Sequence, residues 1–183
     1  EFEKYRQTPQ YYLLNTTFTL SDFKFIFFWE WFHRLWARLI AVAFLIPFII
    51  FLLQRRIKRE MIAPLILLFL FGAFQGAIGW IMVMSGLRGD AVYVKPTKLA
   101  LHFVFAIGLI AYAFWVGLKW MYPGQRAQFP KLRLFTIFII VVTFVQLIFG
   151  ALMAGHKGAV AAPTWPTING SMLPEGLFRE QPM

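Results

Sequence analysis

Beyond Lys24 near its start, four ionisable side chains lie within one apolar stretch, which reads FKFIFFWEWFHRLWAR over residues 23–38. They are Glu30, His33, Arg34 and Arg38. Ionisable groups are rare in membrane helices and usually mark a functional site, because removing them from water costs several kcal/mol. Their spacings of three and four residues place them on roughly one face of a helix. We therefore expect this face to combine a carboxylate, an imidazole and two guanidinium groups.

A second histidine, His102, lies about one turn inside a later apolar segment. It comes to a depth similar to that of His33 if the first turns of the earlier helix extend beyond the membrane. Two imidazoles that face each other from two helices are the ligands of a bis-histidine haem. A tetrahedral zinc site requires more ligands than the sequence offers here. His33 and His102 are therefore candidate metal ligands.

Simpler interpretations of these residues remain open at this point. A membrane histidine is often only a hydrogen-bond partner between two helices. Glu30 either neutralises Arg34 or exchanges protons beside a metal ligand. Arg34 and Arg38 either offset haem propionates or pair with Glu30.

The composition indicates a polytopic membrane protein, because 60% of the 183 residues are hydrophobic. The apolar segments predict four transmembrane helices at about 23–53, 61–85, 98–121 and 133–155. The expected fold class is all-α, an antiparallel bundle of four transmembrane helices. The chain contains no cysteine, which excludes a disulfide framework and an iron–sulfur cluster.

The net charge of +10 is not interpreted as a nucleic-acid surface, because the cations lie between apolar segments. They concentrate in the loops after the first and third segments, and the loop after the second contains fewer, namely Arg88, Lys95 and Lys98, offset by Asp90. The positive-inside rule then predicts that both ends lie on the periplasmic side of the inner membrane. The expected surroundings are membrane lipid.

Three glycines surround a polar residue in the second segment: Gly72, Gly76 and Gly79 lie around Gln75. Gly72 and Gly76 form a small-xxx-small pair, which favours close packing of two helices. The alternative is that Gly76 and Gly79 leave room for a flat ligand. Gln75 is predicted to face either a helix or that ligand.

Two polar segments flank the predicted helices. Residues 1–22 are interpreted as an outer-side lead, in which Thr19 and Asp22 resemble a capping box at the start of the first helix. Residues 157–183 are interpreted as an outer-side tail or loop. His156 is expected to be a solvated residue at a helix end, not a ligand.

Several blocks of the sequence together resemble one enzyme family. They are WEWFHR at 29–34, GAFQGAIGWIMVMSGL at 72–87, LALHFVFA at 99–106, QLIFGALMAG at 146–155 and TWPTINGSMLPEG at 164–176. In this order, and with apolar segments between them, they are similar to haem A synthase of the mitochondrial and Gram-negative type. The resemblance covers nearly the whole chain, from YRQTP at 5–9 onward.

This resemblance implies an eight-helix membrane enzyme with two similar halves, which oxidises the ring methyl of haem O to the formyl of haem A for terminal-oxidase biogenesis. It implies that Glu30 is the catalytic carboxylate and that His33 and His102 are the histidine pair of the substrate half. The other residues expected to contact the cofactor are Trp29, Arg34, Arg38, Gln75, Gly76 and Gly79. Trp31 and Phe28 are expected to line an apolar pocket with Trp29.

The sequence departs from the family pattern in its extent. Its four segments correspond to the second to fifth helices of the family, so it is expected to be part of a longer protein. A relay haem b would be held by ligands outside this chain. Haem O synthase or the terminal oxidase is the expected protein partner, and the sequence identifies no electron donor.

Two other functions use the same residues differently. A membrane haem b electron-transfer subunit needs the histidines but has no use for Glu30. A non-catalytic subunit of a respiratory complex would need neither.

Overall fold

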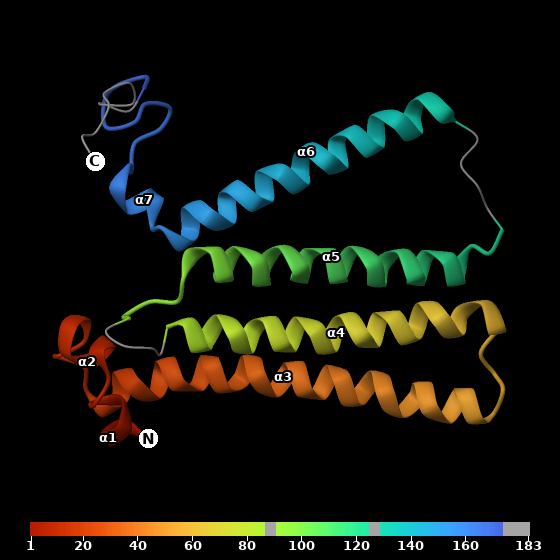
Figure 1. Cartoon of the computed structure of the whole chain (residues 1–183), viewed down its shortest axis with the longest axis horizontal. Coiled ribbons are helices and arrows are strands. Elements are labelled where there is room, and N and C mark those ends of the chain that lie inside the picture. Colours follow the sequence, from red (N-terminus) through yellow and green to blue (C-terminus); the bar gives the residue numbers. More distant parts are fainter. Residues whose placement is uncertain (87–90, 125–128, 174–183) are drawn as a thin grey trace.

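The computed structural model describes residues 1–86, 91–124 and 129–173. In these residues it contains helices and no β-strand. Four long helices make up most of the chain (Figure 1): α3 (Leu20–Leu53), α4 (Arg59–Ser85), α5 (Pro96–Met121) and α6 (Pro130–Gly155). Three short helices accompany them: α1 (Phe2–Tyr5), α2 (Pro9–Leu14) and α7 (Gly158–Ala161). The loop residues Arg88, Asp90 and Arg126 and the end of the tail, 174–183, lie outside the described residues.

Each long helix is apolar and long enough to cross a membrane. Within their most apolar windows, at most 17% of the residues are buried inside the protein. Backbone hydrogen bonds are satisfied within each helix, so apolar side chains can face lipid without cost. The all-α fold class and the four transmembrane segments are thus confirmed, and the chain is a multi-pass membrane protein.

The helix starts follow from local sequence signals. The Thr19 backbone N–H donates to Asp22 Oδ2 at 2.9 Å, and the Asp22 N–H donates to Thr19 Oγ1 at 3.4 Å. This reciprocal pair is the predicted capping box, and it begins α3 three residues before the expected position. Proline stands in the first turn of α5 and of α6, where a missing N–H is tolerated.

The residues before α3 fold back onto its first turn. Thr8 caps α2, and its side chain accepts a hydrogen bond from the Tyr11 N–H. The rings of Phe2 and Tyr5 lie 5.3 Å and 5.2 Å from the ring of Phe23. Asn15 Nδ2 donates to the Tyr5 hydroxyl at 2.6 Å. The lead segment is thus an ordered cap that contacts the start of α3.

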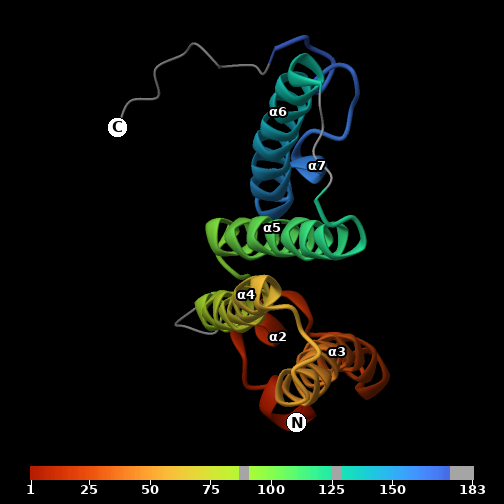
Figure 2. The same ribbon diagram turned by 90° about the vertical axis from the view of Figure 1, so that its right-hand side faces the viewer.

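The long helices are antiparallel to their neighbours in sequence and follow one another in the order α3, α4, α5, α6 (Figures 1 and 2). The main contacts are those of α4 with α5 and of α5 with α6, while α3 contacts α4 less extensively. At one end of the α5–α6 pair, a Cβ on Gly155 would lie 2.8 Å from Pro96. Glycine therefore permits the two helices to approach there.

A small apolar core lies where α3, α4 and α5 converge, at the end opposite to the lead segment. Met61 and Leu65 of α4 pack with Val116 of α5, and Phe44 of α3 covers them. Beside this core, the Tyr112 hydroxyl donates to the Pro64 carbonyl at 3.2 Å. This core fixes α4 against α5, and it therefore also sets the alignment of their other halves.

Candidate functional site

The ionisable face of α3 is open. Glu30 and Arg34 form an ion pair with an N–O distance of 3.6 Å. Their side chains are 63% and 47% exposed, so the interaction is weak in the described structure. His33 and Arg38 are also exposed. The helical spacing predicted from the sequence thus leaves the carboxylate and His33 accessible on the same helix.

The opposite side of the site is packed, because α4 and α5 hold His102 between them. Gln75 Nε2 lies 3.1 Å from His102 Nδ1 and donates to the His102 carbonyl at 2.9 Å. Gln75 Oε1 is buried and has no hydrogen-bond partner among the described residues. Leaving a buried amide oxygen without a hydrogen-bond partner costs about 1–3 kcal/mol. Because both contacts of Nε2 are with His102, the structure favours contact of Gln75 with a helix, specifically with the histidine of α5.

Gly79 provides the surface on which the His102 ring lies. A Cβ on Gly79 would lie 2.8 Å from His102 Cε1 and 3.3 Å from Nδ1, which is closer than real Cβ contacts allow. The glycine therefore makes room for the histidine ring.

The other two glycines behave differently, which corrects one prediction. No described atom lies within 4 Å of a Cβ on Gly72 or Gly76. The small-xxx-small pair was favoured as a close helix contact, and that interpretation is wrong for the described chain. Of the three glycines, it is Gly79 that lies against α5, where it meets the ring of His102.

His33 and His102 stand on α3 and α5, which lie on either side of α4 and run in the same direction (Figure 1). His102 contacts Gln75 through Nδ1, so Nε2 is the ring nitrogen that Gln75 does not engage. Two imidazoles from two helices fit the donor set of a bis-histidine haem.

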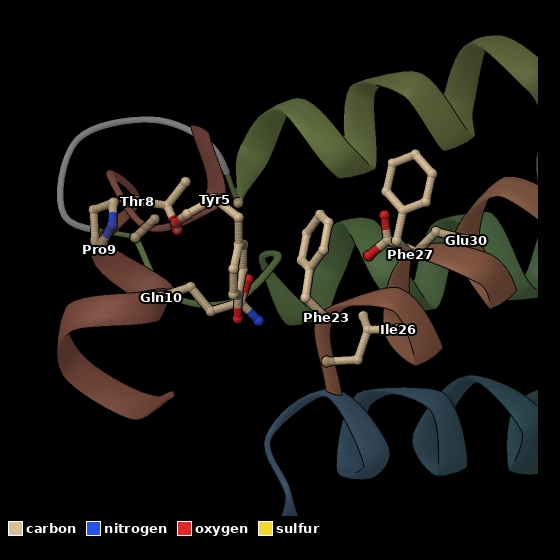
Figure 3. Close-up of a pocket in the computed structure, with 10 residues that line it drawn as sticks. Tyr5, Thr8, Pro9, Gln10, Phe23, Ile26, Phe27 and Glu30 are labelled. Atoms are coloured by element: carbon tan, nitrogen blue, oxygen red, sulfur yellow. Dashed lines mark hydrogen bonds between the residues drawn. The ribbon is translucent and has the colours of Figure 1, made fainter. Parts of the chain in front are cut away.

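A pocket of about 210 Å³ lies beside Glu30, between the lead segment and α3 (Figure 3). Phe27 and Glu30 form one side of it, and Thr8, Pro9 and Gln10 lie on the other. Its lining includes neither histidine, and pockets for ligands of drug size usually have about 300–1,000 Å³. This pocket is therefore an approach to the carboxylate and not the space for a macrocycle.

The aromatic residues that line this pocket are not those expected around the haem, whose predicted lining stays a prediction. The pocket is lined by Phe23, Ile26 and Phe27, which lie at helical spacing with Glu30. Trp29 is not part of its lining; it is 53% exposed and packs against Phe25 and Phe28. The reason is that neighbouring positions on a helix face different directions.

The remaining histidine does not join this site. His156 is exposed and forms the C-cap of α6. The described residues contain no cluster of three or more side chains of His, Cys, Asp or Glu that could hold a metal ion. Within this part of the chain, His33 and His102 therefore remain the candidate pair.

The chain also matches a known protein family. Residues 1–182 match the COX15-CtaA family, which is described as cytochrome oxidase assembly protein. The chain belongs to this family.

Curated relatives of this COX15-CtaA chain carry the name Heme A synthase. The protein of Bradyrhizobium diazoefficiens is 44% identical over 99% of this chain and 51% of its own length. Those of Parvibaculum lavamentivorans and Flavobacterium psychrophilum are each 39% identical, over 100% and 98% of this chain and 53% and 54% of their own length. The chain thus spans about half the length of these relatives. No solved structure matches it.

Sequence reasoning missed the direct link between Gln75 and His102. A signal for it exists, because Gln75 and Gly79 are i,i+4 neighbours and share one face of α4. What the sequence does not contain is the register of α4 against α5, which decides that this face meets His102.

Proposed function

We propose that the chain forms the substrate half of a haem A synthase, a membrane oxidoreductase that converts the ring methyl of haem O to the formyl of haem A. The main support is membership of the COX15-CtaA family, together with the name Heme A synthase that the relatives carry. His33 and His102 support it further, because they offer the two imidazoles of a bis-histidine haem from two different helices.

His33 and His102 are the proposed axial ligands of the substrate haem. The Nε2 atom of His102 is the proposed ligand atom, since Nδ1 is engaged by Gln75. Arg34 and Arg38 are the proposed partners of the propionates, because guanidinium groups bind carboxylates in a bidentate manner. Gly76 borders open space on α4 and is proposed to lie next to the macrocycle.

Glu30 is the proposed catalytic carboxylate, one helical turn before His33. Conversion of the methyl to an alcohol adds one oxygen atom at the oxidation level of water and removes two electrons and two protons, and conversion of the alcohol to an aldehyde removes two further electrons and two protons. Glu30 would accept a proton or stabilise positive charge that develops beside the ring. Its exposed carboxylate and its place on the pocket wall are compatible with proton exchange with water. The electrons would pass to a relay haem b held by ligands outside this chain.

The proposed location is the inner membrane, with both ends of the chain on the periplasmic side. Its support is the charge of the loop between α3 and α4, which contains Arg55, Arg56 and Lys58. The pocket beside Glu30 would then open toward the outer side. Haem O synthase and the terminal oxidase are the proposed partners, as the source of the substrate and the recipient of the product.

A reduced-minus-oxidised visible spectrum of the purified protein tests this function, followed by extraction and mass analysis of its haem. Haem O, its alcohol form or haem A is the expected content. Haem b alone would instead indicate an electron-transfer subunit. Absence of haem from protein purified with its natural partners would contradict the proposal and favour a non-catalytic subunit.

A further inference from the structure

The geometry of α4 assigns Gln75 a role that acts through His102: we infer that Gln75 is a positioning residue, which orients the His102 ring and accepts a hydrogen bond from its Nδ1–H through Oε1 when haem is bound. This inference rests on the proposed function, since it takes His102 as a haem ligand. It changes the expected role of Gln75 from direct contact with the cofactor to control of a ligand.

The first step concerns the proton on the imidazole. Gln75 Nε2 lies 3.1 Å from His102 Nδ1, and an amide nitrogen can only donate. Nδ1 therefore accepts in this arrangement, and the ring proton of neutral His102 lies on Nε2. Iron binding through Nε2 requires the other tautomer, with the proton on Nδ1. The hydrogen bond of the described structure thus opposes ligation.

The second step concerns the oxygen of the same amide. Gln75 Oε1 is buried and has no hydrogen-bond partner in the described part of the chain. A turn of the amide that brings Oε1 to Nδ1 would give this oxygen a donor. Nε2 could keep its bond to the His102 carbonyl, now 2.9 Å away. One movement would therefore satisfy the oxygen and select the tautomer that binds iron.

The third step concerns the ring itself. Gly79 lies one turn after Gln75, and a Cβ there would be 2.8 Å from His102 Cε1. Gln75 contacts one edge of the His102 ring, and the backbone of Gly79, which has no side chain, lies beneath the ring. Together these two residues limit rotation of the ring. Metal-binding histidines usually donate their second N–H to a protein acceptor, which orients the ring and raises its basicity. Gln75 supplies such an acceptor on a neighbouring helix.

The midpoint potential of the haem tests this role, because a hydrogen bond to the second nitrogen of a ligand tunes the metal. Gln75→Leu removes the acceptor, so the ligand donates less charge to ferric iron and the potential rises. Gln75→Glu offers a stronger acceptor, and the potential falls below that of the wild type. Electron paramagnetic resonance of the ferric protein reports the orientation of the imidazole, and a change is expected in Gln75→Leu.

Gln146→Leu is the matched control, because it removes an amide from α6 at an exposed position. Its potential and resonance spectrum are expected to equal those of the wild type. Should Gln75→Leu not accumulate, Gln75→Glu alone decides through the opposite shift. Wild-type potential and spectrum in both Gln75 variants would overturn this inference while leaving the proposed function intact. A wild-type protein without haem would overturn the proposed function, and this inference with it.

Discussion

The two sides of the proposed site differ in how firmly the described chain holds them. On α4 and α5, two contacts of Gln75 and the backbone of Gly79 fix His102. On α3, Glu30 and His33 are exposed. One ligand is thus positioned before any haem arrives, while the reactive face stays accessible. The difference teaches that changes on the packed side should act on haem binding through the position of His102, whereas a change of Glu30 on the open side should act on chemistry.

The strongest test of this difference is Glu30→Ala on the open side. Haem content should stay at the wild-type level, while formation of haem A falls by about 10²–10⁴-fold, the usual contribution of an acid–base group. Haem extraction and mass analysis of the same preparation measure both quantities. Glu60→Ala, at the other end of the helices, should change neither. Normal haem A output from Glu30→Ala would remove Glu30 from the mechanism.

On the packed side, His102→Ala should reduce haem occupancy. The loss of affinity should exceed the roughly 10–100-fold that changes behind a metal ligand cause. Pyridine haemochrome titration of purified protein gives the occupancy per chain. Unchanged occupancy would contradict the assignment of His102 as a ligand.

Gly79→Ala should have a smaller effect on the same side. The new Cβ would meet the His102 ring at 2.8 Å and displace it. Haem affinity should fall by about 10–100-fold, as for other groups that orient a ligand. Gly72→Ala is the control on the same helix, because its Cβ would meet no described atom within 4 Å. Equal affinities in the two variants would show that the ring does not depend on Gly79.

The smallest effect is expected for Arg34→Gln on the open side. Its ion pair with Glu30 is exposed, and such pairs contribute about 0.2–1 kcal/mol, so thermal stability of the purified protein should change little. Haem affinity should fall by about tenfold, which corresponds to about 1.4 kcal/mol, because a propionate loses its guanidinium partner. Unchanged haem affinity would remove Arg34 as a propionate partner.

Much of the fold could be predicted from the sequence, because its signals are local. Length and hydropathy determine the four long helices, and the pair of Thr19 and Asp22 marks the start of α3. The lead helices were missed, although Thr8 before Pro9 is a recognisable start signal for α2. Such short helices depend on tertiary contacts, here those with Phe23.

The candidate site was predictable only in its components. Periodicity placed Glu30 and His33 on one face of a helix, and the expected depths suggested that His102 could meet them. Which residues of α4 face His102 depends on the register and rotation of two packed helices. These follow from side-chain packing at many positions, so the sequence alone could not distinguish Gly79, which meets the ring, from Gly76, which does not.

The length of α3 has a consequence for the energy of its charges. Its 34 residues extend about 51 Å, and the 26 residues of α5 about 39 Å. Asp22 and Lys24 are charged, and the lead segment before them is polar. The part of α3 that exceeds the membrane thickness is therefore expected at the start of the helix, in the headgroup layer. Glu30 follows Asp22 by eight residues, or about 12 Å. We therefore expect the carboxylate near the membrane surface, where its ionised form costs less than at the bilayer centre. A proton that leaves it needs only a short path to the nearer surface.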